Sequence, residues 1–298
     1  MKVYYKHTNG TIFRILYEGK HAVTGEELLI YQAMFDKGEI WVLPKKKFLE
    51  STEFVKISES EALLQIPVEL NPKYFFPEIC YTPDVPNLID EGSGFSKNVQ
   101  AMKTLLIKKN LINDNLFGSL KNDDDLEKLI IDRIRSYNSG DGLEEIFHLI
   151  QIWGGSAGRG IYVFGNGFTW EDVGYCYQQL VDACLMANDI SESSVDIIVK
   201  AVYEFNEAIR NIGVAFITKH TRYWLYRNLG LNALPIYDSI MANCVMKKGT
   251  AEVRDLLEYW RVMIAKSTQL GVKLVPLERQ IFKYAYQHSN RQNYKFKM

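Results

Sequence analysis

The chain has 298 residues, of which 47% are hydrophobic, which is enough for two domains with packed cores and excludes a disordered protein. Its formal net charge is −1, so overall electrostatics give no evidence of a polyanionic partner. No run of roughly 18 apolar residues occurs, and no apolar stretch follows the first lysine, so the sequence predicts a cytoplasmic protein without a membrane span or signal peptide.

The four cysteines are scattered along the chain, and none falls in the short spacing of a zinc or redox motif. We therefore expect no metal site, no disulfide framework and no four-cysteine iron–sulfur loop. Free cysteines usually lie in protein cores, so all four are predicted to be buried thiols. They are Cys80, Cys176, Cys184 and Cys244.

The first part of the chain, residues 3–57, alternates short β-like runs with turn-rich segments. The runs are TIFRILYEG, LLIYQAMF and EIWVLP. This pattern predicts a small, mostly antiparallel β module over residues 1–58. It holds no nucleophile paired with a base, so we do not expect it to be an enzyme by itself.

Several short motifs lie within this module: Tyr5-Lys6-His7 with Gly10, Lys20-His21, Thr24-Gly25-Glu26-Glu27, Tyr31-Gln32-Ala33, and Ile40-Trp41-Val42 before Pro44. On these motifs the segment resembles the small DUF1653 family, whose role is unknown. His7, His21 and Trp41 are expected to form turns and a barrel core. A contact with a ligand or with nucleic acid is the alternative for these three residues.

Prolines mark the next segment, because five of the eight in the chain lie between Pro67 and Pro86. The acidic, glycine-containing run IDEGSG follows them. Proline disfavours regular helices, so residues 59–94 are predicted to form a linker or an irregular wrap. The aromatic residues Tyr74, Phe75 and Phe76 indicate that this segment packs on a neighbour.

Beyond residue 95 the apolar residues recur at steps of three and four, which is typical of amphipathic helices. The residues 123–137, for example, place apolar side chains on one face and three aspartates at the helix start. The chain is therefore predicted to be α+β, with the β module followed by one all-α domain over residues 95–298. Helices are expected at 96–110, 123–137, 143–153, 170–187, 194–212, 217–229, 251–269 and 276–288.

The C-terminal end is rich in cations, and from residue 261 onward Glu278 is the single acidic residue. This end is a candidate phosphate-facing surface, and a solvated, partly frayed tail is the alternative. The cations are Arg261, Lys266, Lys273, Arg279, Lys283, Arg291, Lys295 and Lys297.

A tight connection joins two predicted helices, because one ends near Ile212 and Gly213, and the next begins around Thr218. Such a hairpin points backbone N–H groups outward, where they can hold a DNA phosphate. Lys219 would then lie in the first turn of the second helix. There the positive end of the helix dipole would lower the pKa of its amine, as a nucleophile requires.

Asp238 is the second candidate catalytic residue, and eighteen residues separate it from Lys219. That interval fits a three-turn helix closed near Gly230, followed by a short return through Leu234-Pro235. The return is predicted to bring Asp238 toward the helix start. A carboxylate beside an amine nucleophile can accept its proton and stabilise positive charge on a sugar.

Three short motifs follow one another between residues 213 and 238: Gly213-Val214, Thr218-Lys219 and Pro235-Ile236-Tyr237-Asp238. This arrangement resembles the helix-hairpin-helix DNA glycosylase superfamily, and most closely its 8-oxoguanine glycosylase branch. The loop NIGVAFIT is longer than the family hairpin and lacks its second glycine. Tyr237 also separates Pro235-Ile236 from the aspartate.

The resemblance implies a DNA glycosylase that acts on double-stranded DNA with a flipped base. Lys219 would attack C1′ of the sugar, Asp238 would be the essential carboxylate, and strand cleavage by β-elimination could follow. The implied DNA-binding residues are Gly213, Val214, Thr218, His220 and Arg222. No metal or organic cofactor is implied, although such a hairpin can recruit a monovalent cation.

A second constellation lies in residues 152–170, where glycines alternate with aromatic residues and one arginine. An extruded base needs aromatic faces for stacking and a cation for its edge, so Trp153 and Arg159 are candidates for a base pocket. The alternative is a glycine-rich turn whose aromatic side chains pack in the core.

Two other functions remain open from the sequence. The first is a nucleic-acid-binding protein of the same fold that has lost the reaction. The second is an enzyme that cleaves the N-glycosidic bond of a free nucleotide or nucleoside, which the modest net charge would suit. The base, protein partners and role of the β module are undefined, and both DNA repair and defence against phage DNA fit the resemblance.

Overall fold

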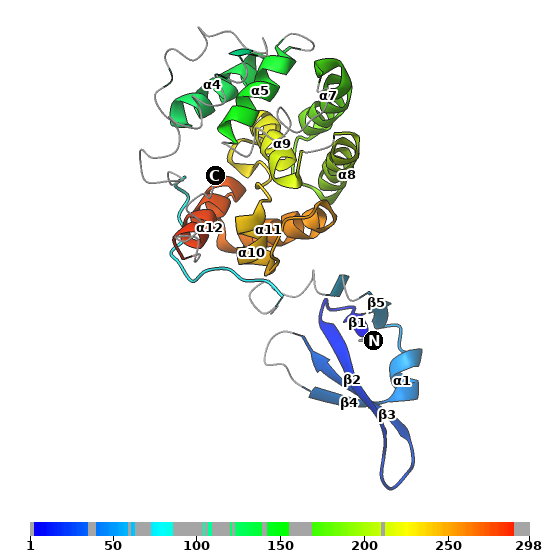
Figure 1. Cartoon of the computed structure of the whole chain (residues 1–298). Helices are drawn as coiled ribbons and strands as arrows, with labels where there is room; N and C mark the ends of the chain where they lie inside the picture. The colour runs from blue at the N-terminus through cyan, green and yellow to red at the C-terminus, as the bar shows by residue number, and fades with distance from the viewer. Residues whose placement is uncertain are drawn as a thin grey trace. The chain divides into compact units, whose positions relative to one another are not determined.

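The computed structural model describes residues 3–34, 40–58, 61–62, 73–85, 104, 107–108, 120, 123–138, 142–154, 169–209 and 212–288. Two compact units make up the chain, Met1–Phe75 and Phe76–Met298 (Figure 1). The first contains the sheet and the second is helical, so the predicted α+β layout is confirmed. Several predictions lie outside the described residues: Arg159, most of the helix at 96–110, and the tail cations Arg291, Lys295 and Lys297.

The N-terminal unit is a five-stranded antiparallel sheet with the order β4-β3-β2-β1-β5. A β-bulge between Ile15 and Tyr17 shifts the register of the second and third strands. The predicted antiparallel β module is therefore confirmed. Its elements are β1 (Tyr4–His7), β2 (Ile12–Lys20), β3 (Glu27–Ala33), β4 (Ile40–Pro44), helix α1 (Lys45–Glu50) and β5 (Phe54–Ile57).

One face of this sheet packs on α1 through aromatic rings. Phe48 of α1 is fully buried, and its ring stacks on that of Phe54 with centroids 4.2 Å apart. Strand alternation brings Leu29 and Tyr31 to the same cluster. Trp41 lies on the edge strand β4 and is 49% exposed, so its predicted place in the core is wrong.

The two histidines of this unit form turns, as predicted. The Nδ1 atom of His7 accepts a hydrogen bond from the backbone N–H of Asn9 at 3.2 Å. The Nδ1 atom of His21 accepts one from the N–H of Thr24 at 3.2 Å. These local bonds stabilise the turns that precede β2 and β3.

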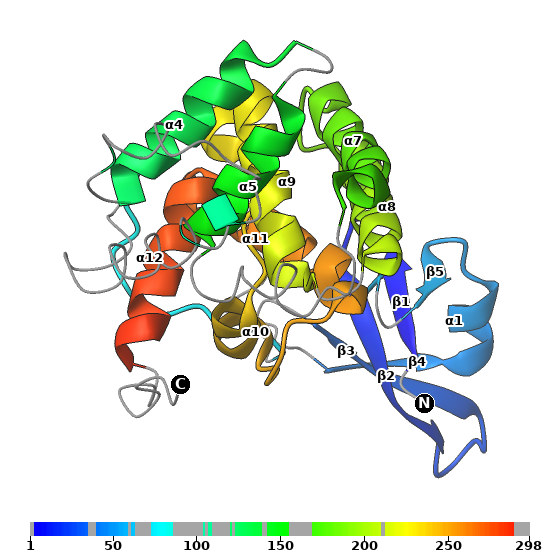
Figure 2. The ribbon, with the colours of Figure 1, turned by 45° about the horizontal axis from the view of Figure 1, so that its top comes forward.

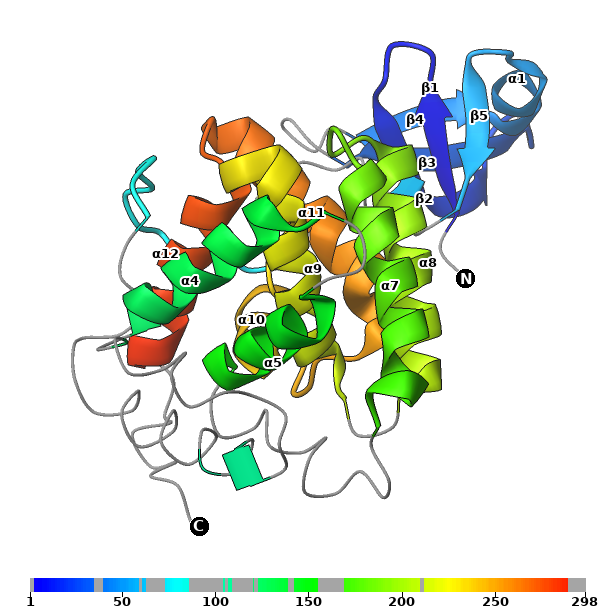
Figure 3. The ribbon, with the colours of Figure 1, turned by 90° about the horizontal axis from the view of Figure 1, so that it is seen from above.

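The second unit is built around the helix α9, which packs against α4, α5, α7 and α8. Figures 2 and 3 show α9 between the α4–α5 pair and the α7–α8 pair. The helices are α4 (Asp123–Ser136), α5 (Leu143–Trp153), α7 (Trp170–Met186), α8 (Glu192–Ala208), α9 (Val214–Leu229), α10 (Ser239–Met246), α11 (Leu256–Leu270) and α12 (Leu274–His288). Two 3-10 turns, η4 (Gly230–Asn232) and η5 (Val253–Asp255), lie between them.

The boundary between the units falls within the segment predicted as a linker. Residues 76–85 belong to the helical unit, where the Thr82 N–H donates to Oε1 of Gln280 at 2.9 Å and the Gln280 amide donates back to the Thr82 carbonyl at 2.8 Å. The predicted packing of this segment on a neighbour is therefore correct for residues 76–85. The helical unit starts earlier than residue 95.

The cysteines differ from the prediction in their burial. Cys184 of α7 is fully buried, and burial raises the pKa of its thiol. Cys80 is exposed, and Cys176 and Cys244 are half-buried, so three of the four are not core thiols. Among the described residues, no helix has the length and apolar character needed to cross a membrane.

Candidate functional site

The helix that carries Lys219 begins earlier than predicted. Gly213 is its N-cap, and the Gly213 carbonyl accepts from the N–H groups of Phe216 at 2.9 Å and Ile217 at 3.2 Å. Lys219 is therefore the sixth residue of α9 and lies in its second turn. The predicted first-turn position was wrong, so the helix dipole does not explain a lowered lysine pKa, since that effect fades beyond the first turn.

Aromatic rings surround the ammonium group of Lys219 instead. Its Nζ atom lies 4.3 Å from the ring centroid of Phe216, one turn earlier on α9, and 5.7 Å from that of Trp153 at the end of α5. Burial lowers the pKa of Lys219, and the negative charges of Asp238 and Glu278 oppose this effect. The predicted direction of the shift is retained, but its cause is desolvation.

The return segment from Ala233 to Asp238 runs through the interior. Residues 233–237 are all buried, and their backbone groups bond to side chains of neighbouring helices. The Pro235 carbonyl accepts from the indole N–H of Trp260 at 2.8 Å, and the Ile236 carbonyl accepts from the hydroxyl of Tyr259 at 2.9 Å. The segment is thus held by α11.

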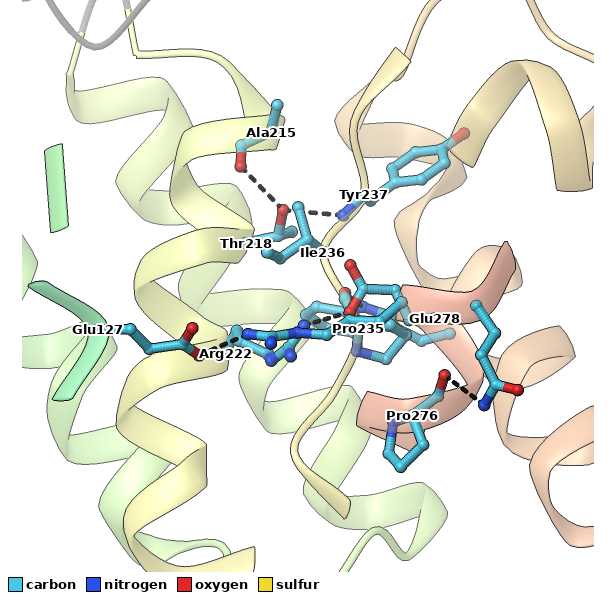
Figure 4. Close-up of polar contacts among 12 residues, drawn as sticks. Glu127, Ala215, Thr218, Arg222, Pro235, Ile236, Tyr237, Pro276 and Glu278 are labelled. Atoms are coloured by element: carbon cyan, nitrogen blue, oxygen red, sulfur yellow. Dashed lines mark hydrogen bonds and ion pairs between the residues drawn. The ribbon is translucent and has the colours of Figure 1, made fainter. Parts of the chain in front are cut away.

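Thr218 holds the same segment from the side of α9. Its Oγ1 atom accepts a hydrogen bond from the backbone N–H of Tyr237 at 3.0 Å (Figure 4). Thr218 directly precedes Lys219 and Tyr237 directly precedes Asp238, so this bond joins the neighbours of both candidate catalytic residues. The structure therefore brings the backbone segments that carry Lys219 and Asp238 together, and the charge of Asp238 acts on the Lys219 pKa.

Asp238 is the N-cap of the short helix α10. Its Oδ1 atom accepts from the N–H groups of Ile240 and Met241, each at 2.9 Å. These bonds and the helix dipole stabilise the ionised carboxylate and fix its orientation. The residue is partly exposed. An anchored carboxylate near an amine is suited to proton transfer and to stabilising a cation.

The predicted DNA contacts of α9 are mostly placed in the interior. Gly213 is exposed at the start of α9, whereas Val214 and Thr218 are buried. The Thr218 hydroxyl serves the return segment, so the prediction that it contacts DNA was wrong. Gly213 is the predicted contact that stays accessible to a phosphate.

His220 belongs to a buried polar network, which corrects its predicted role as a DNA contact. Its ring stacks on that of Phe147 with centroids 4.8 Å apart, and its Nδ1 atom is 2.9 Å from the hydroxyl of Tyr177. The same hydroxyl accepts from the indole N–H of Trp224 at 2.7 Å, so Trp224, Tyr177 and His220 form one buried network. The amide nitrogen of Gln151 donates to Nε2 of His220 at 3.0 Å, so the proton of neutral His220 is assigned to Nδ1.

Arg222 also lies inside the unit, where it forms an ion pair with Glu278 of α12 (Figure 4). Its predicted contact with DNA was therefore wrong. Burial raises the pKa of the Glu278 carboxyl, and the positive charges of Arg222 and Arg279 oppose this rise. Arg279 bonds in turn to Glu127 of α4 at 2.5 Å, so a chain of alternating charges links α4, α9 and α12.

Three of the five described cations of the predicted phosphate-facing surface at the C-terminal end are engaged with other side chains of the helical unit. Arg261 pairs with Glu192 and Asp196 of α8, and Arg279 pairs with Glu127. Lys266 is buried, with its Nζ atom 5.3 Å from the ring centroid of Phe76. Arg261 and Arg279 thus pair with carboxylates of other helices and Lys266 packs on a ring, which the order of charges along the chain could not show.

Trp153 at the end of α5 lies beside Lys219, and its place in a base pocket stays a prediction. Its ring meets that of Tyr223 edge to face at 5.2 Å and lies near the Lys219 ammonium. Phe216 is the aromatic neighbour that sequence analysis missed, because its segment was assigned to a loop. A helix starting at Gly213 would have placed Phe216 and Lys219 three residues apart on one face.

Gly154 is required by the close approach of Phe216. A Cβ atom at Gly154 would lie 2.1 Å from Cε1 of the Phe216 ring. Gly154→Ala is therefore expected to displace this ring from Lys219 and to lower the free energy of unfolding by about 1–3 kcal/mol. Urea denaturation measures the change, with Gly249→Ala as the control because no atom lies within 4 Å of its added Cβ. Equal effects of the two substitutions would contradict this prediction.

Comparison with known proteins supports one part of the sequence analysis. Residues 3–58 match the family described as "Protein of unknown function (DUF1653)". This confirms the resemblance of the N-terminal module. No helix-hairpin-helix glycosylase family matches the helical unit. No curated protein and no solved structure matches the chain.

Proposed function

We propose that the helical unit is a DNA glycosylase with β-lyase activity, in which Lys219 is the nucleophile and Asp238 the essential carboxylate. The observation that carries this proposal is the Thr218–Tyr237 hydrogen bond, which joins the neighbours of these two residues. The lowered pKa of Lys219 and the aromatic rings of Phe216 and Trp153 beside its amine add support. Such rings provide faces on which an extruded base can stack.

The proposed reaction starts from the neutral amine of Lys219. Its nitrogen bonds to C1′ of the sugar while the bond from C1′ to the base breaks, and the base leaves with the electron pair and takes up a proton. Loss of the amine proton and opening of the C1′–O4′ bond then give an imine, with a proton transferred to O4′. Loss of a C2′ proton with departure of the 3′-phosphate cleaves the strand.

Asp238 acts on the charges of this reaction. Its carboxylate stabilises positive charge that develops on the sugar as the base leaves, and it can take the proton that the Lys219 amine releases. The hydrogen bonds from Ile240 and Met241 occupy Oδ1 and fix the orientation of the carboxyl plane. The carboxylate therefore needs little reorganisation during the reaction.

Borohydride trapping tests the proposal, because borohydride reduces an imine to a stable amine and links the protein to DNA. Full-length protein should be incubated with duplexes that carry oxidised, alkylated or hypermodified bases and with a duplex that carries an abasic site. A covalent product with at least one of them is expected. No product with any duplex, at protein concentrations that bind DNA, would favour a binding protein that lacks the reaction.

The rate of reaction is expected to increase with pH. Only the neutral amine attacks, and its fraction rises as Lys219 loses its proton. Because burial lowers the pKa of Lys219, the midpoint of this rise should lie below the pKa of an ordinary lysine, about 10.4. Single-turnover rates over roughly pH 6–10 measure the midpoint. A midpoint at or above the ordinary value would contradict the prediction.

An enzyme that acts on a free nucleoside or nucleotide is the second candidate. It is favoured by the ion pairs of Arg261, Arg222 and Arg279, which leave these cations engaged with carboxylates. Binding to duplex DNA would show an inverse dependence of affinity on salt, since bound cations are released from the phosphates. Salt-independent affinity together with hydrolysis of free nucleosides would support this second candidate.

A further inference from the structure

We propose that Thr218 is a positioning residue that sets the distance between the Lys219 amine and the Asp238 carboxylate. The inference rests on the proposed function, in which both groups act on one sugar. The family resemblance implies that Thr218 contacts DNA, but the residue is fully buried. A different role must therefore explain its polar side chain at this point of α9.

The Thr218 hydroxyl acts both as a hydrogen-bond donor and as an acceptor. Its single proton is donated within α9, to the carbonyl of Val214 at 2.9 Å or of Ala215 at 3.2 Å. A lone pair of Oγ1 accepts the backbone N–H of Tyr237 at 3.0 Å. The donor bond orients the hydroxyl, and the second substituent on Cβ further restricts its rotation.

This hydroxyl links the two parts of the candidate site through the residues that directly precede Lys219 and Asp238. Thr218 is bonded directly to Lys219, and Tyr237 is bonded directly to Asp238. Tyr259 and Trp260 hold the carbonyls of the return segment from α11, while Thr218 holds an N–H group from α9. The segment is thereby fixed from both sides, and α9 sets its position relative to Lys219.

Removal of the hydroxyl should act on the chemical step. In Thr218→Val, a methyl group of similar size replaces Oγ1, and the buried N–H of Tyr237 loses its acceptor. The return segment is then expected to shift away from α9 and to take Asp238 with it. A displacement of about 1 Å at a reacting group can slow the reaction on the order of 100-fold. DNA affinity should stay unchanged, since the buried hydroxyl contacts no DNA.

The test compares Thr218→Val with Thr218→Ser in the full-length protein. The serine variant retains the hydroxyl, so it should keep the rate of base release and of borohydride trapping within a few-fold of wild type. Thr218→Val should lower the single-turnover rate roughly 10- to 100-fold with little change in the dissociation constant for DNA. A valine variant as fast as wild type, or a serine variant as slow as the valine variant, would overturn the proposal.

If the wild-type protein is inactive, the proposed function is refuted. The claim that Thr218 positions the two groups is then tested by crystallography. Crystal structures of wild type and of both variants would then give the distance from Lys219 Nζ to the Asp238 carboxylate. The claim stands if this distance changes in Thr218→Val and is preserved in Thr218→Ser. Equal distances in all three proteins would overturn it.

Discussion

Lys219→Gln is expected to abolish borohydride trapping and to slow base release by roughly 10³-fold or more, because the amide cannot act as a nucleophile. Glutamine retains much of the side-chain length, so it should preserve packing beside the rings of Phe216 and Trp153. DNA affinity should therefore stay within a few-fold of wild type. Single-turnover release of the base, a trapping gel and a binding titration measure the three quantities.

Lys266→Gln is the matched control for this loss. Lys266 likewise lies beside an aromatic ring, but it is buried on α11 and bonds to Gln269 at 3.1 Å. The same chemical change should there leave trapping intact. Trapping that survives in Lys219→Gln, or that disappears equally in Lys266→Gln, would remove Lys219 from the reaction.

Arg222→Met is expected to lower the free energy of unfolding by about 3–5 kcal/mol, because it leaves the buried carboxylate of Glu278 without its main partner. Arg222→Met combined with Glu278→Leu removes both charges, so the double variant should regain much of the lost stability. Urea denaturation of the two single variants and the double variant measures the coupling between the residues.

Arg133→Met serves as the control, because its partner Glu145 lies 2.8 Å away in an exposed ion pair. Exposed pairs contribute about 0.2–1 kcal/mol, so this variant should be nearly as stable as wild type. If Arg222→Met instead weakened DNA binding and left the free energy of unfolding unchanged, Arg222 would be a phosphate contact and the buried pair would have no structural role.

The sequence predicted those elements whose patterns are local. The helix expected at 170–187 is found at Trp170–Met186, where Thr169 caps it by accepting the N–H of Asp172 at 3.3 Å. The β module was recognisable from strand alternation and turn residues, and its family match agrees. Lys219 and Asp238 were identified from motif spacing, and the structure places their direct neighbours in contact.

Helix boundaries near the site were harder to predict. Apolar residues continue past the end of α8, so the helix was extended to residue 212, but Ile209 and Ile212 are buried beyond its end at Ala208. The start of α9 was placed too late, because bulky residues after Gly213 were assigned to a loop. The helix α10 was missed because its N-cap, Asp238, was interpreted through its chemistry alone.

Partners distant in sequence could not be predicted from one chain. Arg222 and Glu278 are 56 residues apart, and Tyr177 and His220 are 43 apart. Local composition does not show whether a charged or aromatic polar residue is buried or exposed, since the deciding partner belongs to another helix. The resemblance implies that Arg222, His220 and Thr218 contact DNA, and the sequence alone could not show that they lie in the interior.

The central claim is that the amine of Lys219 forms the covalent intermediate with DNA. Peptide mass spectrometry of the borohydride-trapped complex tests it most directly, because the digest identifies the modified residue. The account predicts that the sugar adduct lies on Lys219. An adduct on another lysine or on the N-terminal amine, with Lys219 unmodified, would contradict it.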